Sequence, residues 1–145
     1  MLVGAMPQST HVRTLARLAR MLERGAGDLS LPQFRVLALV DEGGERASQL
    51  AERLAVAKPT VTAVVDGLVE RGYLKRAADS DDRRATKITL TAAGRRALYD
   101  AEHAMHTRLH DVLAYADDPE AVERALNDLA DAITRARDER LGATR

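Results

Sequence analysis

Apolar residues recur at intervals of three and four along most of the chain, with charged residues between them. Over residues 8–24 the apolar positions share one side of a helical projection and four arginines share another, which predicts an amphipathic helix. The same spacing predicts further helices over residues 31–40, 47–55, 58–71, 92–115 and 119–140. The sequence therefore predicts a mainly helical protein.

Local signals mark where several of these helices begin and end. Ser30 lies shortly before the proline of the second predicted helix, and Pro59 stands in the first turn of the fourth. Thr91 is suited to cap the fifth helix, because its hydroxyl can accept a hydrogen bond from a first-turn N–H. Gly72 is suited to end the fourth helix in a left-handed conformation, and Gly94 is expected to weaken the fifth only slightly.

Two short stretches break the helical spacing. Residues 73–77 and 86–90 are compatible with β-strands. The segment between them, 78–85, is polar and rich in residues that favour turns. These stretches predict a hairpin with a charged tip.

The order of the elements predicts a winged helix-turn-helix. Two short helices, 47–55 and 58–71, are joined by a tight turn and followed directly by the hairpin. The outward face of the second helix carries small and hydroxyl-bearing side chains, whereas a solvated helix usually carries a mixture of Glu and Lys. Short side chains allow a helix to lie deep in a major groove, so this face predicts contact with DNA.

The charge is unevenly distributed, although the formal net charge of the whole chain is zero. Residues 1–57 carry seven Lys or Arg and six Asp or Glu, residues 58–96 carry nine and five, and residues 97–145 carry six and eleven. A basic middle segment followed by an acidic one indicates a localised patch for a polyanion. Ordinary variation among solvated faces is the alternative explanation.

The composition excludes several classes of protein. A chain of 145 residues suits one domain, and it contains no cysteine, which excludes disulfides, thiolate chemistry and Cys-ligated metals. No apolar run approaches the roughly 20 residues of a membrane span, and no signal peptide is evident, so we expect a cytoplasmic protein without a membrane partner. Since no Gly-rich phosphate loop, nucleophile elbow or zinc-protease motif occurs, we expect neither an enzyme nor a cofactor.

Six segments in register resemble the MarR family of bacterial transcription regulators. They are LPQFRVL from residue 31, QLAERL from 49, TVTAVVDGL from 60, RGYLKR from 71, DSDDRR from 79 and LTAAG from 90. The resemblance runs continuously over residues 31–95, with predicted helices of fitting length on either side. One segment alone would not suffice, but six in the same order are specific.

The resemblance implies a fold that is mainly α with a small β-hairpin wing. It implies a winged helix-turn-helix DNA-binding domain over residues 29–91 and a helical dimerisation region built from residues 1–28 and 92–145. A homodimer of this kind presents two reading helices to a pseudo-palindromic operator, roughly 34 to 36 Å apart, and is usually a repressor. A small aromatic or phenolic anion usually controls DNA binding in the family. No residue identifies that effector here, so the pocket residues stay unassigned.

The helix that begins at Lys58 is expected to enter the major groove of the operator. Thr60, Thr62 and Ala63 are assigned to base edges, and Lys58 to a nearby phosphate or base. Asp66 resembles a family position that orients a neighbouring side chain, although a plain surface carboxylate is an equal alternative. Two residues of the preceding helix are assigned to phosphates. The DNA-facing residues predicted on the two helices are Ser48, Gln49, Lys58, Pro59, Thr60, Thr62 and Ala63.

The hairpin is expected to contact the groove beside the reading helix. Arg83 and Arg84 at its tip are placed to enter a narrow, A·T-rich minor groove, which concentrates negative potential. The family's Asp-x-Arg arrangement maps onto residues 82–84, so Asp82 is expected to orient Arg84 through an ion pair. Arg76 and Lys87, on the strands, are expected to contact phosphates.

Two alternative functions follow from other features. His103, His106 and His110 lie on one predicted helix, and the last two have the i, i+4 spacing of a metal-ligand pair. Some members of the MarR family sense zinc with a histidine pair on the corresponding helix, but no motif assigns the further ligands that a site would need. A winged helix can also serve as a protein-interaction module. Bulky apolar residues on the outward helix face would favour that function, and this face has none.

Overall fold

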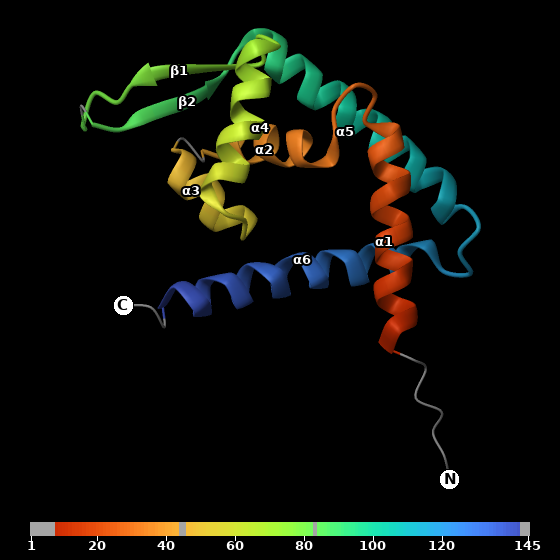
Figure 1. Ribbon diagram of the computed structural model, residues 1–145. Helices are drawn as coiled ribbons and strands as arrows, with labels where there is room; N and C mark the ends of the chain where they lie inside the picture. Colours follow the sequence, from red (N-terminus) through yellow and green to blue (C-terminus); the bar gives the residue numbers. More distant parts are fainter. Residues whose placement is uncertain (1–7, 44–45, 83, 143–145) are drawn as a thin grey trace. The chain divides into compact units, whose positions relative to one another are not determined.

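The computed structural model describes residues 8–43, 46–82 and 84–142, and within them it is mainly helical with a single two-stranded antiparallel sheet (Figure 1). This arrangement confirms the predicted fold class. The elements in chain order are α1 (Gln8–Gly25), α2 (Leu31–Asp41), α3 (Ala47–Leu54), α4 (Lys58–Glu70), β1 (Leu74–Ala78), β2 (Thr86–Leu90), α5 (Ala92–Leu113) and α6 (Pro119–Gly142). The chain forms two compact units, residues 1–108 and 109–145, which are described separately.

The helix boundaries follow the local signals in the sequence. Ser30 caps α2 in a capping box, because its Oγ accepts from the Gln33 N–H at 3.3 Å while the Gln33 side chain accepts from the Ser30 N–H at 3.0 Å. Thr91 caps α5 by accepting from the Gly94 N–H at 3.0 Å. Gly72, just after α4, has φ +76°, as the predicted left-handed end of that helix requires.

The core of the first unit joins the winged helix to α5. Apolar residues from α2, α3, α4, both strands and the first part of α5 are buried in a single cluster. Its largest fully buried side chains are Leu37, Leu50, Leu68, Leu74, Ile88 and Leu98. Because each of these elements contributes at least one residue, burial of this cluster fixes α4 against the base of the hairpin.

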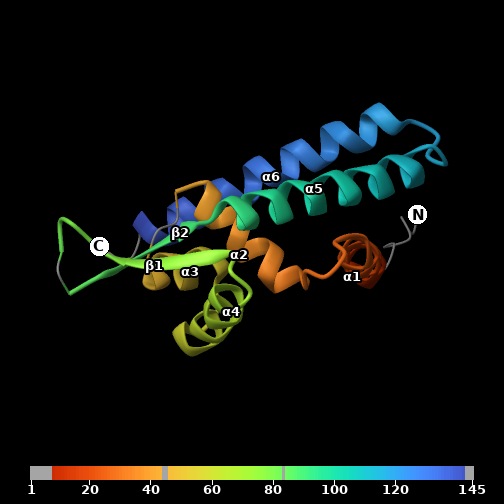
Figure 2. The same ribbon diagram turned by 90° about the horizontal axis from the view of Figure 1, so that it is seen from above.

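The hairpin pairs in a regular antiparallel register from Leu74↔Leu90 to Ala78↔Thr86. Both views show it projecting from the helices α2–α4 as a two-stranded ribbon (Figures 1 and 2). The first strand begins one residue later than the predicted start at Tyr73. The Tyr73 N–H donates to the Leu68 carbonyl at 2.9 Å and so belongs to the end of α4.

The second unit consists of the end of α5 and the helix α6. Asp118 caps α6, since its carboxylate accepts from the Ala121 N–H at 2.9 Å. Several large apolar side chains of α6 are exposed, among them Leu129 and Ile133, the latter by 63%. Among the described residues, no helix has the length and apolar character that crossing a membrane requires.

Candidate nucleic-acid interface

The turn of the helix-turn-helix places the first residues of α4 at the surface. Ala55 ends α3 with φ 53°, a left-handed conformation that reverses the chain within three residues. Ala57 then precedes α4 in an extended conformation, without a side chain that caps the helix. The first turn of α4 therefore lies at the surface, where Pro59 has no N–H to satisfy and the Thr60 N–H donates to the Ala57 carbonyl at 3.0 Å.

The predicted reading face of α4 is exposed. Lys58, Pro59, Thr60 and Ala63 are exposed, and Thr62 is half-buried. The Thr62 hydroxyl donates to the Lys58 carbonyl at 3.0 Å, so in this conformation its oxygen is available to a base as an acceptor and its methyl group can contact a thymine methyl. Val61, Val65 and Leu68, on the opposite side of the helix, are buried in the core. The inward and outward positions of α4 therefore lie as the sequence predicts.

An ion pair connects the reading helix to the wing. Asp66 on α4 and Arg76 on β1 form a salt bridge between partly exposed side chains. Of the two roles considered for Asp66, the structure shows the one in which its carboxylate holds a neighbouring side chain. Arg76 therefore has a carboxylate partner at Nη2, and a guanidinium has further N–H donors that can contact a phosphate.

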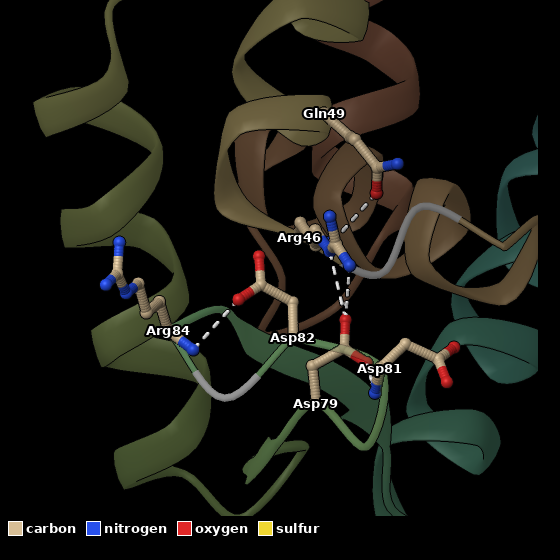
Figure 3. A network of polar contacts seen from close by, with 6 residues as sticks. All are labelled: Arg46, Gln49, Asp79, Asp81, Asp82 and Arg84. Atoms are coloured by element: carbon tan, nitrogen blue, oxygen red, sulfur yellow. Dashed lines mark hydrogen bonds and ion pairs between the residues drawn. The ribbon is translucent and has the colours of Figure 1, made fainter.

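The tip of the wing differs in one respect from the sequence-based expectation. The Asp82 carboxylate accepts from the backbone N–H of Arg84 at 3.0 Å (Figure 3), whereas an ion pair with the guanidinium was expected. The contact is local, because an Asp side chain readily accepts from the N–H two residues later. Asp82 thus holds the main chain at Arg84, whose side chain is exposed. Arg83 lies outside the described residues.

The remaining predicted contacts lie on β2 and at the start of α3. Lys87 is half-buried on β2 and pairs in register with Ala77. Ser48 and Gln49 are in the first turn of α3, where Gln49 is exposed. The Gln49 side-chain oxygen accepts from the Arg46 backbone N–H at 3.1 Å, so its amide nitrogen is the group that remains available to a phosphate.

Sequence reasoning missed Arg46, which lies just before α3. Its side chain forms a salt bridge with Asp79 of the wing at 2.5 Å (Figure 3). The Asp79 carboxyl has its pKa lowered by the hydrogen bond from the Asp81 N–H and by that from Arg46, and Asp79 in turn raises the pKa of Arg46. The two residues are 33 positions apart, and no periodic pattern in the sequence relates them.

The histidine pair proposed for zinc does not extend into a larger group of ligands. His106 and His110 are both exposed on α5. Within the described part of the chain, no group of three or more His, Asp or Glu side chains is placed to hold a metal ion. A tetrahedral zinc site requires three or four protein ligands, and two exposed histidines on one helix fall short of that number.

A small cavity lies beside the winged helix in the first unit. Its volume is about 220 Å³. Arg71 at its edge donates to the Asp28 carbonyl at 3.0 Å, and its guanidinium lies 4.8 Å from the centre of the Tyr73 ring. The lining residues are Gly25, Ala26, Gly27, Asp28, Leu29, Arg71, Tyr73, Ala97, Asp100, Ala101 and Ala104. The small side chains contributed by α5 leave this space open.

Comparison with known proteins identifies the family. The profile described as "MarR family" matches residues 27–85. The chain is 30% identical over 132 residues to the uncharacterized HTH-type transcriptional regulator YfiV of Bacillus subtilis (strain 168), covering 88% of this chain and 82% of that protein. It is 32% identical over 85 residues to the HTH-type transcriptional repressor IacR of Pseudomonas putida, covering 58% of this chain and half the length of that protein.

A solved structure agrees with these sequence matches. The transcriptional repressor CouR of Rhodococcus jostii RHA1, bound to a 23-mer DNA duplex, superposes with a TM-score of 0.75 at 27% identity. The match covers 85% of this chain and 89% of that one. The family consists of transcriptional regulators and not of enzymes. With the winged helix-turn-helix and its exposed reading face, these matches establish that the chain belongs to the MarR family and is a DNA-binding transcriptional regulator.

Proposed function

We propose that this regulator is a repressor that binds a pseudo-palindromic operator as a homodimer and leaves it when a small aromatic or phenolic anion binds. The observation that carries the DNA-binding part is the outward face of α4, where Lys58, Thr60 and Ala63 are exposed beside the wing. Repression is supported by the repressors IacR and CouR, which are similar in sequence or structure.

The residue roles follow from the side-chain chemistry. Thr60, Thr62 and Ala63 contact base edges in the major groove, with Lys58 and Pro59 beside them at the helix start. Arg84, together with Arg83, enters the minor groove, and Asp82 positions it through the main chain. Phosphates are contacted by Ser48, Gln49, Arg76 and Lys87.

Dimer formation is supported by large apolar side chains that are exposed to water in the single chain. In the first unit, Val12 on α1 is 66% exposed and Leu15 is also exposed. In the second unit, Leu129 and Ile133 on α6 are exposed. A second copy of the chain would cover such residues, and a two-fold axis would then relate the two reading helices. Sedimentation equilibrium of Val12→Asp and Ile133→Asp tests this: both should weaken the dimer, whereas Asn127→Asp, at an exposed polar position of α6, should not.

Effector control is supported by the cavity beside Arg71. A volume of about 220 Å³ suits one substituted ring, and the guanidinium supplies a donor for a carboxylate or phenolate. Hydroxybenzoates serve as the probe, and they should make the wild-type protein leave its operator. The substitution Ala104→Leu fills the cavity, so this variant should still bind the operator but no longer leave it when a hydroxybenzoate is added. If the Ala104→Leu variant left the operator at the same hydroxybenzoate concentration as the wild type, the effector would bind elsewhere.

The experiment that tests the proposed function is selection of genomic fragments with the purified protein. The enriched site and a scrambled duplex are then titrated by fluorescence anisotropy at two salt concentrations. We expect a pseudo-palindrome bound at least about 10³-fold more tightly than the scrambled duplex. Equal binding to both duplexes that disappears with salt would contradict the proposal, because it would indicate attraction to any polyanion.

A further inference from the structure

The hairpin has few apolar contacts along its outer half. On β1 only Leu74 is buried, and the following residues through Ala78 are exposed. On β2 the buried residue is Ile88, while Thr86 at the outer end is exposed. An isolated two-stranded hairpin is only marginally stable in water, so apolar packing alone leaves the direction of the tip poorly determined. Polar contacts must therefore hold the tip.

One such contact joins Arg46 to Asp79 (Figure 3). The Nε and Nη2 atoms of Arg46 lie 3.1 and 2.5 Å from Oδ2 of Asp79. The second carboxylate oxygen, Oδ1, accepts from the Asp81 N–H at 3.0 Å. The Asp79 side chain is only 11% exposed, whereas that of Asp66 in the other helix-to-wing pair is 57% exposed. Both oxygens of Asp79 are thus engaged in a site shielded from water.

Each end of this pair is built into its own element. On the helix side, the Arg46 N–H donates to Gln49 and the Arg46 carbonyl accepts from the Leu50 N–H at 3.0 Å, as α3 begins. On the wing side, the Asp79 N–H donates to the Ala85 carbonyl at 3.1 Å, which closes the tip. Hydrogen bonds therefore connect Asp79, Asp82, Arg84 and Ala85 of the tip, and the Arg46–Asp79 pair ties Asp79 to the start of α3.

We propose that Arg46 is a positioning residue: through Asp79 it fixes the wing tip relative to the helix-turn-helix and thereby makes the regulator discriminate the base pairs that flank its operator. The inference rests on the proposed function. Minor-groove width and potential depend on sequence, and only an arginine held at one position can read that difference. An arginine on a freely moving tip could contact a phosphate or a groove beside any sequence, so it would not distinguish the flanking base pairs.

Three variants separate this role from simpler ones. Arg46→Ala removes the pair and one positive charge. Asp79→Asn retains an oxygen that can accept from the Asp81 N–H but removes the negative charge, so by electrostatics alone it should strengthen DNA binding. Arg53→Ala is the matched control, because Arg53 lies on α3, which Arg46 precedes, and forms its salt bridge, at 2.5 Å, with Glu42.

Two measurements are made on each variant. The first is the ratio of affinities for two duplexes that share the selected operator and differ only in having A·T or G·C flanks. The second, made without DNA, is amide hydrogen exchange at Arg84 and Ala85 by NMR. We expect Arg46→Ala and Asp79→Asn each to lower the flank ratio at least about threefold and to speed exchange at both amides, with the double variant no worse than either single one. Arg53→Ala should match the wild type in both measurements.

The outcomes distinguish this inference from the proposed function. If the wild type has no specific operator, the proposed function is contradicted, and the inference about the flanking base pairs fails with it. A wild type that binds its operator but ignores the flanks overturns the inference, and so does unchanged exchange in both variants. A normal flank ratio in Asp79→Asn, combined with a reduced salt dependence in Arg46→Ala, also overturns it, because Arg46 would then be a plain phosphate contact.

Discussion

Gly94 on α5 lies against the backbone of Tyr73 so closely that a Cβ at Gly94 would stand 2.0 Å from the Tyr73 carbonyl oxygen. The neighbouring Thr91 hydroxyl donates to the Gly72 carbonyl at 2.6 Å, and the Thr91 N–H donates to the Tyr73 carbonyl at 3.1 Å. The start of α5 is therefore in direct contact with the end of α4, and this contact connects the reading helix to the long helix that follows the wing.

Substitution Gly94→Ala should lower the free energy of unfolding by about 2 kcal/mol or more, since the obstructing atom is backbone and cannot rotate away. Gly67→Ala is the matched control, because Gly67 lies within α4 and a Cβ there would have no other group within 4 Å. It should raise stability by up to about 1 kcal/mol through helix propensity. Denaturant unfolding measures both, and equal stability of the two variants would contradict the close approach.

Ala55→Gly should raise the free energy of unfolding by about 0.5–1 kcal/mol. The φ of 53° at Ala55 is a left-handed conformation that strains a residue with a Cβ, whereas glycine adopts it without that strain. Ala130→Gly, at an exposed helical position of α6, should instead lower stability by up to about 1 kcal/mol. Thermal unfolding compares the two variants. A loss of stability in Ala55→Gly would show that the left-handed turn is not strained.

Arg84→Ala should weaken operator binding and reduce the slope of log K against log salt by about 1, because one cation that neutralises a phosphate leaves the interface. Arg124→Ala serves as the control, since Arg124 is an exposed cation on α6 with Asp118 and Glu120 as its partners. Anisotropy titrations at several salt concentrations measure the slope. Wild-type affinity and slope in Arg84→Ala would exclude the wing from the interface.

Thr62→Val should change the sequence preference of the protein and leave its stability nearly unaltered. The substitution preserves the shape of the side chain but removes the hydroxyl that donates to the Lys58 carbonyl. Thr134→Val removes an equivalent bond, from Thr134 to the Ala130 carbonyl at 3.1 Å, away from the reading face. Repeating the operator selection with each variant is the measurement. The same enriched site for Thr62→Val and the wild type would remove Thr62 from base recognition.

The Asp79 contact should depend on pH in a defined direction. Because the pKa of Asp79 in the folded protein lies below its ordinary value of 3.8, its stabilising contribution is complete above that value and is lost as the pH falls through the lower folded pKa. A ¹³C NMR titration of the carboxyl group should therefore give a midpoint below 3.8. In Arg46→Ala the midpoint of the Asp79 titration should rise, although the hydrogen bond from the Asp81 N–H should still keep it below the ordinary value. A wild-type midpoint at or above the ordinary value would contradict this arrangement.

Much of the fold depends on local rules and could be predicted from the sequence. The spacing of Val61, Val65 and Leu68 distinguishes the buried side of α4 from its exposed side, because a helix returns to the same face every three or four residues. Ser30 and Thr91 act on N–H groups only three residues away, so their capping role is visible in the sequence. The exposed Lys58 to Ala63 face of the candidate interface follows from the same period.

Other relationships arise only when distant segments meet. Gly94 looked like a mild weakness in α5, yet the approach of Tyr73, which precedes the wing, requires a residue without a side chain there. Arg46 and Asp79 pair across 33 positions, and the orientation of two elements decides which carboxylate an arginine reaches. Local periodicity thus determined the helices and the outward face of α4, and turn-forming residues marked the hairpin. The position of the wing depends on contacts that have no sequence period, because they form between surfaces that only tertiary packing brings together.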